Sequence, residues 1–315
     1  LVALPLKPPL LPQLARSRER LPEGEGWAYE PRWDGFRAIA FVDGDAVELQ
    51  SRNGKTLTRY FPELRFPPGR YVLDGEIVIH GPSGRQEFEL LGQRIHPAAS
   101  RVARLAEETP AVFIAFDLLA RDDEVLLELP YAERRGALEA LVAEPIQLTP
   151  KVDTAADAER WLREAEGVIA KDAAAPYRPG ERVGMVKVKR VRTIDAVVLG
   201  WRPGKAEGTV GSLILGLYDD AGHLHEVGHS SGFKAREKKE LVGRLAPYET
   251  GERGSGDPSR WTMGRELEWV KLRPELVVEI TFDHASDGRI RHGAKVQRWR
   301  DDKPPRECTV DQLDA

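Results

Sequence analysis

The sequence predicts two domains: an α+β domain over residues 1–190, followed by a small β-barrel domain over residues 191–315. A length of 315 residues is enough for about two domains, each with a core of its own. Strand-like runs alternate with helical segments in the first part, whereas short strand-like runs separated by glycine turns dominate the second. The 41% hydrophobic and 31% charged residues are typical of a globular chain.

The first domain opens with an extended, proline-rich segment over residues 1–26. Asp-Gly and Asn-Gly turns then separate apolar runs, which is typical of short strands. Pro130 suits the first turn of a helix, and Thr154 followed by Asp157 suits a helix cap with an acidic first turn. The helices expected here cover residues 87–94, 130–144 and 154–167. The expected strands cover residues 38–42, 46–50, 71–80, 112–119, 167–171 and 184–189.

The second domain is predicted from a change in the sequence pattern near Lys189–Arg192. Beyond this point the apolar runs are short and glycines separate them, which is typical of strands in a small barrel. One helical stretch interrupts the strands, over residues 235–245. The expected strands cover residues 196–201, 212–218, 223–229, 267–272 and 276–282.

Composition excludes several classes of protein. The single cysteine, Cys308, excludes an intramolecular disulfide framework and a cysteine-based zinc site, and fits a reducing cytoplasm. No apolar run approaches the roughly 18 residues of a membrane span, so we expect no membrane partner. A Walker-type phosphate loop is absent from the sequence. His223, His225 and His229 lie close together, but no acidic or cysteine partner is evident, and we expect no metal site there.

The charge pattern leaves nucleic-acid binding open. The net charge of −4 does not indicate it, but binding depends on where the charges lie. Residues 182–192 and 289–306 are both rich in lysine and arginine. These stretches are either solvated faces or surfaces for nucleic acid.

Two stretches that contain acidic residues are candidates for chemistry. The stretch 29–37, Tyr-Glu-Pro-Arg-Trp-Asp-Gly-Phe-Arg, is a tight charged turn before an apolar strand and suits a phosphate-handling site. Its Asp34-Gly35 pair is also ordinary turn chemistry. Asp74-Gly75-Glu76 places two acids inside an apolar strand, where they need partners. The stretch is therefore a bulge or exposed edge, or it offers a carboxylate to a ribose hydroxyl or a metal.

Further candidates each have a functional and a structural interpretation. Glu166 precedes Gly167, a pattern that either ends a helix or presents a carboxylate to Mg²⁺. Lys187 and Lys189 share one face of a strand, where they meet phosphates or protect an edge. Phe116 is either a core aromatic or a platform for a base.

Two arginine-containing turns complete the candidates. Arg52, in Ser51-Arg52-Asn53-Gly54, could grip a terminal phosphate. Arg300-Asp301-Asp302-Lys303 is a dense charged turn with little value for a core.

In their order along the chain, these motifs resemble those of the covalent nucleotidyltransferase superfamily. The resemblance is specifically to ATP-dependent DNA ligases of the bacterial ligase C type, and to the ligase domain of ligase D. Each motif is weak alone, but the ordered set covers nearly the whole chain. The motifs are Glu-Pro-Arg-Trp-Asp-Gly-Phe-Arg at 30–37, Ser-Arg-Asn-Gly at 51–54, Leu-Asp-Gly-Glu at 73–76, Ala-Phe-Asp-Leu-Leu at 115–119, Glu-Gly-Val-Ile-Ala-Lys at 166–171, Lys-Val-Lys at 187–189 and Arg-Asp-Asp-Lys at 300–303.

The resemblance implies a nucleotidyltransferase (adenylation) domain with antiparallel sheets over residues 1–190 and an OB-fold domain over residues 191–315. It implies three steps: transfer of AMP from ATP to a lysine, transfer of AMP to the 5′-phosphate of a nick, and sealing by the 3′-hydroxyl. The implied cofactors are ATP and Mg²⁺ or Mn²⁺. The implied partners are nicked duplex DNA and, in repair and recombination, a polymerase or primase or end-binding proteins. A monomer in the bacterial cytoplasm, associated with the nucleoid, is expected.

The resemblance also assigns roles to residues. For the nucleotide, it implies that Phe116 stacks on adenine, that Glu30 lies in the nucleotide site, and that Glu76 holds the ribose or a metal. Glu166 is implied as a metal ligand. The other implied roles are contacts to the α-phosphate (Lys187 and Lys189), contacts to AMP or the nick phosphate (Arg37 and Arg52), orientation of the reacting group (Asp34), and completion of the adenylation step from the second domain (Arg300, Asp302 and Lys303).

One position departs from the family pattern Lys-x-Asp-Gly, because Arg32 stands at the lysine. Arginine stays protonated and its nitrogens are delocalised, so it is a very poor nucleophile. We therefore predict that the chain cannot form the enzyme–AMP intermediate, but binds ATP and nicked DNA and seals nicks that are already adenylated. Arg32 is either a deliberate substitution or a feature of a natural relative. The alternatives are a non-catalytic binder of nicks or nucleotides and an RNA ligase or capping-type nucleotidyltransferase.

Overall fold

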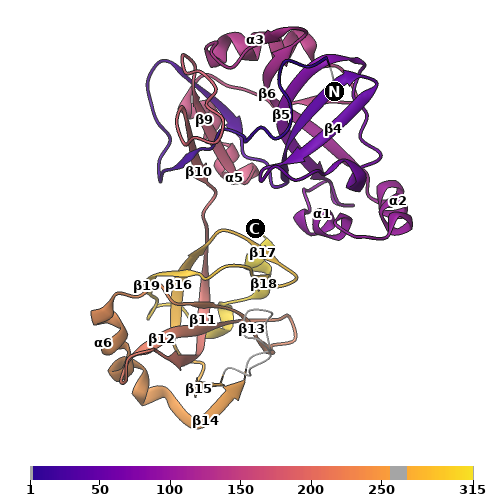
Figure 1. Cartoon of the computed structure of the whole chain (residues 1–315). Helices are drawn as coiled ribbons and strands as arrows, with labels where there is room; N and C mark the ends of the chain where they lie inside the picture. Colours follow the sequence, from indigo (N-terminus) through magenta and orange to yellow (C-terminus); the bar gives the residue numbers. More distant parts are fainter. Residues whose placement is uncertain (1–2, 256–267, 315) are drawn as a thin grey trace. The chain divides into compact units, whose positions relative to one another are not determined.

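The structure is a computed structural model that describes residues 3–255 and 268–314. The chain divides into two compact units, Leu1–Arg190 and Val191–Ala315 (Figure 1). Within the described residues, no helix is both long enough and apolar enough to cross a membrane. Leu267, at the start of one expected strand, lies outside the described residues.

The first unit contains two sheets that are mainly antiparallel. Its strands are β1 (Arg16–Ser17), β2 (Trp27–Pro31), β3 (Phe36–Gly44), β4 (Ala46–Ser51), β5 (Gly69–Ile79), β6 (Ala111–Arg121), β7 (Glu124–Val125), β8 (Gln147–Leu148), β9 (Gly167–Asp172) and β10 (Met185–Lys189). The larger sheet has the order β4-β3-β5-β6-β7, with β8 paired to β6. The smaller has the order β1-β10-β9-β2. Parallel pairing occurs between β1 and β10 and between β6 and β8.

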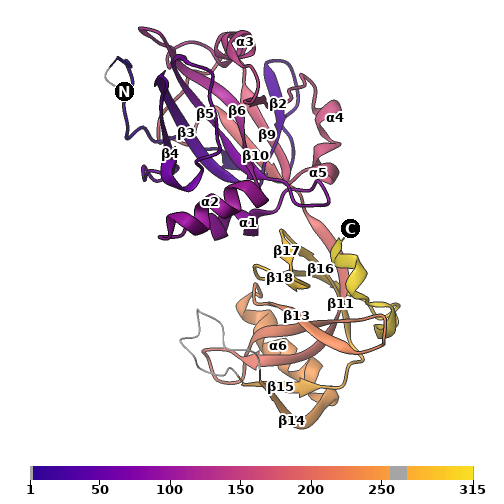
Figure 2. The same cartoon turned by 90° about the vertical axis from the view of Figure 1, so that its right-hand side faces the viewer.

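Helices cover parts of these sheets. They are α1 (Phe88–Arg94), α2 (Ala99–Glu108), α3 (Tyr131–Leu141), α4 (Ala155–Ala158) and α5 (Trp161–Glu164). The helix α3 packs against β6 and contributes the fully buried Leu138 to the core of the larger sheet (Figure 2). Trp161, at the start of α5, forms a separate cluster with Val168 and Val188 of the smaller sheet.

The expected helices of this unit are present, with two corrections. The helix expected over residues 130–144 ends at Leu141, because the residue before Pro145 disfavours helical backbone. The helix expected over residues 154–167 is two short helices, α4 and α5, and the chain becomes extended at Ala165 before β9. Thr154 does cap α4, since its hydroxyl accepts the backbone N–H of Asp157.

The second unit is a strongly curled sheet. Its elements are β11 (Arg192–Pro203), β12 (Val210–Tyr218), β13 (Leu224–Ser230), α6 (Ala235–Leu245), β14 (Glu249–Ser255), β15 (Glu268–Leu272), β16 (Val277–Phe282), β17 (Ala285–Ser286), β18 (Arg289–Ile290) and β19 (Lys295–Trp299). The long β11 pairs with β12, β15 and β16 and carries two register shifts against β12, which bend it. The apolar faces enclose one core that includes Val197, Leu215, Ile280 and the free Cys308.

Candidate active site

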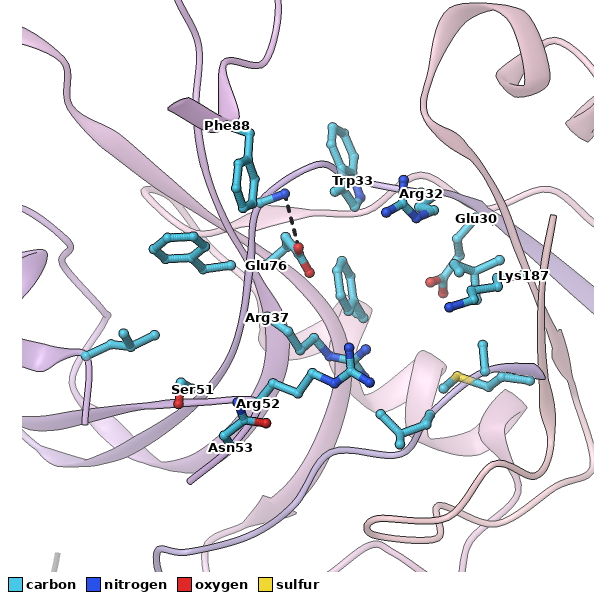
Figure 3. A pocket seen from close by; sticks show the side chains of 18 of the residues that line it. Glu30, Arg32, Trp33, Arg37, Ser51, Arg52, Asn53, Glu76, Phe88 and Lys187 are labelled. Atoms are coloured by element: carbon cyan, nitrogen blue, oxygen red, sulfur yellow. Dashed lines mark hydrogen bonds between the residues drawn. The ribbon is translucent and has the colours of Figure 1, made fainter. Parts of the chain in front are cut away.

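A cavity of about 710 Å³ lies in the first unit (Figure 3). Strands of both sheets, the turn after β4 and the helix α1 supply its walls. It is large enough for a nucleotide. The expected site residues that line it are Glu30, Arg32, Arg37, Arg52, Glu76, Phe116 and Lys187.

The turn between β2 and β3 places Arg32 in this cavity. The backbone N–H of Arg32 donates to the Gly167 carbonyl at 2.8 Å, and its guanidinium reaches the Glu166 carbonyl at 3.4 Å. A side chain at Gly35 would lie 2.2 Å from the Ile77 carbonyl, so glycine is required for this close approach. The N–H of Gly35 donates to Glu76 at 3.2 Å, which ties the turn to β5.

Several cationic side chains line the cavity. Arg32, Arg52, Arg182 and Lys187 all line it. The pKa of Lys187 is lowered, first by burial and then by repulsion from Lys189, Arg32 and the other arginines. An anionic ligand would relieve this repulsion, so the cavity is suited to phosphate groups.

The carboxyl group of Glu76 lines the cavity and has a strongly shifted pKa. Burial raises its pKa to about 8, and Asp74 contributes in the same direction, although Arg37 and Arg32 oppose the shift. Within the described part of the chain, no group of three His, Cys, Asp or Glu residues is placed to hold a metal ion. A divalent cation would therefore need Glu76 together with phosphate oxygens, which is a usual arrangement for Mg²⁺.

Phe116 provides a flat apolar face in the cavity. It is half-buried on β6, with the Arg37 guanidinium 5.3 Å and the Lys171 amine 5.6 Å from its ring centroid. An aromatic face of this kind can stack on a nucleobase. The expected structural alternative, an aromatic buried in the core, does not describe its position.

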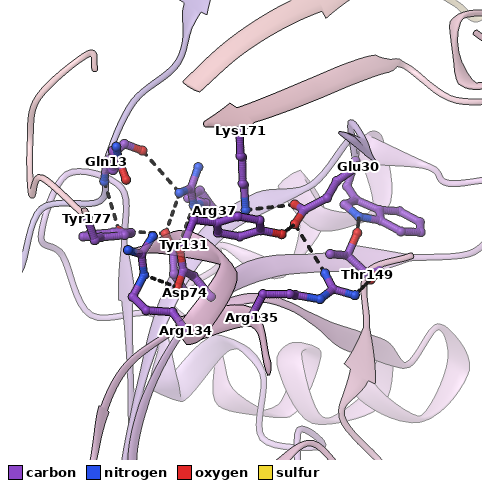
Figure 4. A network of polar contacts seen from close by, with 12 residues as sticks. Gln13, Glu30, Arg37, Asp74, Tyr131, Arg134, Arg135, Thr149, Lys171 and Tyr177 are labelled. Atoms are coloured by element: carbon purple, nitrogen blue, oxygen red, sulfur yellow. Dashed lines mark hydrogen bonds and ion pairs between the residues drawn. The ribbon is translucent and has the colours of Figure 1, made fainter. Parts of the chain in front are cut away.

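A buried polar network lies beside Phe116 (Figure 4). The carboxylate of Glu30 is 2% exposed and pairs with Lys171 at 2.9 Å and with Arg135 at 3.3 Å. The Tyr131 hydroxyl also donates to it. Sequence reasoning missed Lys171 as a site residue, although a lysine directly after the apolar run Val168–Ala170 in one strand signals a buried charge that needs a partner.

Three expected residues do not line the cavity. Asp34 follows Trp33, and its backbone N–H donates to Gln86 at 2.7 Å. Lys189 ends β10 and is exposed, although it shares a strand face with Lys187. Glu166 meets Arg32 through its backbone carbonyl.

The expected residues of the second unit form a network of their own. Arg300 donates to both oxygens of Asp195, at 3.1 and 3.3 Å, and pairs with Asp302 at 2.9 Å. The Lys303 amine lies 3.6 Å from Asp195. The side chain of Gln312 bonds both the N–H and the carbonyl of Asp195. This holds Asp195 in place as the shared anchor of Arg300 and Lys303.

The expectation that the histidines lack an acidic partner is wrong. Asp219 lies 2.6 Å from His225 and 3.5 Å from His223. These contacts lower the pKa of Asp219 to about 2, with the hydrogen bond from His225 as the largest cause. The partner is close in space because β12 and β13 are antiparallel neighbours, which the histidine spacing alone did not reveal.

Comparison with known proteins identifies the family. The profile described as ATP dependent DNA ligase domain matches residues 9–189, and the profile described as ATP dependent DNA ligase C terminal region matches residues 206–303. The chain belongs to the ATP-dependent DNA ligases. DNA ligase C1 of Mycolicibacterium smegmatis is 45% identical to this ligase over 99% of the chain and 96% of the relative. DNA ligase C of Mycobacterium tuberculosis is 44% identical over 99% and 95%.

A solved structure shows the same fold. The ligase domain of Mycobacterium tuberculosis LigD is 32% identical to this ligase, covers 95% of the chain with 98% of its own, and has a TM-score of 0.54. The expected fold class, a nucleotidyltransferase domain with antiparallel sheets followed by an OB-fold domain, is confirmed. The resemblance to ligases of the C type is confirmed as well.

Proposed function

We propose that this ligase binds ATP and nicked duplex DNA and seals nicks that already carry AMP, but does not adenylate itself. The observation that carries the proposal is the cavity in which Arg32 lies beside Arg52 and Lys187, with Phe116 available to stack on adenine. Residues 1–190 act as the adenylation domain and residues 191–315 as the OB-fold domain.

Arg32 blocks the first step of the reaction. A nucleophile must offer a lone pair to the α-phosphorus of ATP, and an arginine does not lose its proton at neutral pH. The guanidinium still supplies positive charge where the phosphate would bind. Nucleotide affinity is therefore retained while covalent transfer is lost.

The sealing step does not need a lysine nucleophile. The 3′-hydroxyl oxygen attacks the 5′-phosphorus, a new P–O bond forms, the phosphoanhydride bond to AMP breaks, and the hydroxyl proton leaves to solvent. Arg37, Arg52 and Lys187 stabilise the charge that develops on the phosphate oxygens. Phe116 and Glu30 hold the AMP leaving group in place.

A divalent cation completes the proposed site. Mg²⁺ or Mn²⁺ would be held by Glu76, with Glu166 as the second expected ligand, and would neutralise phosphoryl charge. Because burial raises the pKa of Glu76, its proton must leave before a metal can bind. Metal affinity is therefore expected to rise between pH 6 and pH 9.

The remaining roles follow the sequence resemblance. We propose that Lys189 contacts the nucleotide phosphate from the end of β10 and that Asp34 orients the reacting group. Arg300, Asp302 and Lys303 serve the adenylation step. We further propose that the ligase acts as a monomer in the bacterial cytoplasm, near the nucleoid, in DNA repair and recombination with a polymerase, a primase or an end-binding protein.

The test is adenylation with α-labelled ATP and Mg²⁺, read on a denaturing gel, for the chain and for Arg32→Lys. We expect label only on the lysine variant. In parallel, both proteins receive a nicked duplex whose 5′-end already carries AMP, and both should seal it. Label on the arginine chain would show that another lysine carries AMP. Binding of the nick without any sealing would favour the non-catalytic alternative.

A further inference from the structure

The guanidinium of Arg37 lines the cavity, but the groups that accept its hydrogen bonds do not. Its Nε and Nη2 donate to the two oxygens of Asp74, at 2.5 and 2.6 Å, and Nη2 also reaches the Gln13 carbonyl at 3.3 Å (Figure 4). The ring of Phe116 lies against the same guanidinium. A bidentate carboxylate fixes both the position and the plane of an arginine. Whatever controls Asp74 therefore controls the direction of Arg37.

Tyr177 controls Asp74. Its hydroxyl lies 2.7 Å from Oδ2 of Asp74 and 3.0 Å from the backbone nitrogen of Gln13. A backbone N–H can only donate, so the hydroxyl accepts from Gln13 and must give its own hydrogen to Asp74. The geometry thus fixes the direction of both hydrogen bonds. Burial, followed by the charge of Asp74, raises the pKa of Tyr177 well above its usual value, so the hydroxyl remains a donor.

Gln13, Tyr177 and Asp74 form a hydrogen-bonded relay, which is buried. Tyr177 and Asp74 are each 1% exposed, and neither lines the cavity. The nearby Arg134 does not compete for Asp74, because it makes a bidentate pair with Asp117 at 2.8 and 3.0 Å. The carboxylate of Asp74 receives hydrogen bonds from Arg37 and Tyr177 alone among the residues that the structure describes.

The relay also joins two distant parts of the chain. The proline-rich segment that contains Gln13 is anchored by its side-chain amide to the Val183 carbonyl at 2.5 Å. The next residues, Leu14 and Ala15, line the cavity. Loss of the Tyr177 hydroxyl would leave the buried N–H of Gln13 unpaired and remove one donor from a buried carboxylate, both of which are costly.

We propose that Tyr177 is a positioning residue that, by donating its hydroxyl hydrogen to Asp74 and accepting from Gln13, directs the guanidinium of Arg37 at the phosphate undergoing sealing. The inference rests on the proposed function, since it assumes that Arg37 meets that phosphate. It predicts that Tyr177 affects the rate of the reaction only while Arg37 is present.

The test is a double-mutant cycle on the sealing of pre-adenylated nicks. Tyr177→Phe removes one oxygen and keeps the ring. The matched control is Tyr71→Phe, because Tyr71 is also buried and donates to the Pro67 carbonyl, away from Arg37. Single-turnover rate, nick affinity and melting temperature are measured for each variant, alone and with Arg37→Ala.

We expect Tyr177→Phe to slow sealing about tenfold, as the loss of one buried charge-assisted hydrogen bond would do, and Tyr71→Phe to change it less than about twofold. In the Arg37→Ala background, Tyr177→Phe should change the rate less than about twofold. A tenfold loss that persists without Arg37 would show a general structural role and overturn the inference, as would a normal rate in Tyr177→Phe. Lower melting temperatures shared by both tyrosine variants would not explain a loss confined to one.

The cycle separates this inference from the proposed function. If the parent chain seals no pre-adenylated nick but Arg32→Lys seals nicks with ATP, the proposal about Arg32 fails, and the same cycle is run in the lysine variant. If neither seals, nick affinity replaces rate as the measured quantity. Coupling between Tyr177 and Arg37 in that affinity supports the relay, and additivity overturns it.

Discussion

Apart from Arg37, which pairs with Asp74, the cations with a proposed role have different surroundings in the two units of the molecule. In the cavity of the first unit, no carboxylate pairs with the side chains of Arg32, Arg52 or Lys187 among the described residues. In the second unit, Arg300 and Lys303 both lie against the carboxylate of Asp195. These three cations of the first unit therefore have no carboxylate partner within the described part of the chain, whereas Arg300 and Lys303 share one.

A cavity lined by unpaired cations is better suited to bind an anion than a cluster whose cations already have carboxylate partners. Burial first, and then repulsion from the neighbouring cations, lowers the pKa of Lys187, and a phosphate ligand would remove that repulsion. In contrast, a phosphate that approaches Arg300 must displace a carboxylate that already satisfies it. We therefore expect the first unit to provide most of the nucleotide affinity, and the second unit to act only after an exchange of partners.

The largest expected effect comes from Lys187→Met, which removes a cavity cation and keeps the side-chain length. The rate of sealing of pre-adenylated nicks should fall about 100-fold or more, because the cation stabilises charge that develops on the phosphate. Single-turnover kinetics measure the rate. The control is Lys7→Met, in the same unit and exposed. A sealing rate that stays within about threefold of the parent's would show that Lys187 does not stabilise the reacting phosphate.

The second effect concerns the neutralised network. Asp195→Asn should destabilise the second unit by about 1–3 kcal/mol, because it leaves Arg300 and Lys303 without their shared, partly buried counter-ion. Hydrogen exchange of the β11 amides in urea reports this loss locally. The control Asp301→Asn changes an exposed carboxyl 3.8 Å from Arg244 and should cost far less. Equal losses of unfolding free energy in the two variants would show that Asp195 does not anchor this network.

The third effect is a pH dependence inside the cavity. Since the folded pKa of Glu76 is raised to about 8, mainly by burial, its contribution to stability is full below about pH 4.5 and is lost as pH rises through 8. Glu76→Gln keeps a neutral group at every pH. Relative to the parent, the variant should gain about 1–2 kcal/mol in unfolding free energy between pH 5 and pH 9. Urea unfolding at both values measures the gain, and a difference independent of pH would show that Glu76 is ionised throughout.

Much of the fold was predictable because the chain's apolar runs are clear. The run from Val112 to Leu119 lies inside β6, and the helix expected over residues 235–245 is α6. The polar strands β14 and β19 were missed, because neither Glu249–Ser255 nor Lys295–Trp299 shows the apolar alternation that marks a strand.

Only those residues of the site that stand in short local motifs could be predicted from the sequence. Glu76 and Phe116 stand in short motifs and both line the cavity. Asp195, Tyr177 and Lys171 were missed because their roles depend on partners far away in the chain. Tyr177, for example, meets Asp74 across 103 positions.

The smallest expected effect tests whether exposure explains the contrast within the second unit. Asp302 pairs with Arg300 as closely as Asp195 does, but its side chain is 70% exposed whereas that of Asp195 is 14% exposed. Its pKa is lowered to about 2, first by the hydrogen bond from Arg300, so its stabilising contribution is present above about pH 4 and is lost as pH falls through 2. Asp302→Asn should shift the melting temperature at pH 7 by less than about 2 °C, because water screens an exposed pair. Thermal melts of this variant beside Asp195→Asn give the ranking. A larger shift for Asp302 would mean that the bidentate geometry of Arg300, rather than burial at Asp195, holds the motif, and the anchor would have to be reassigned.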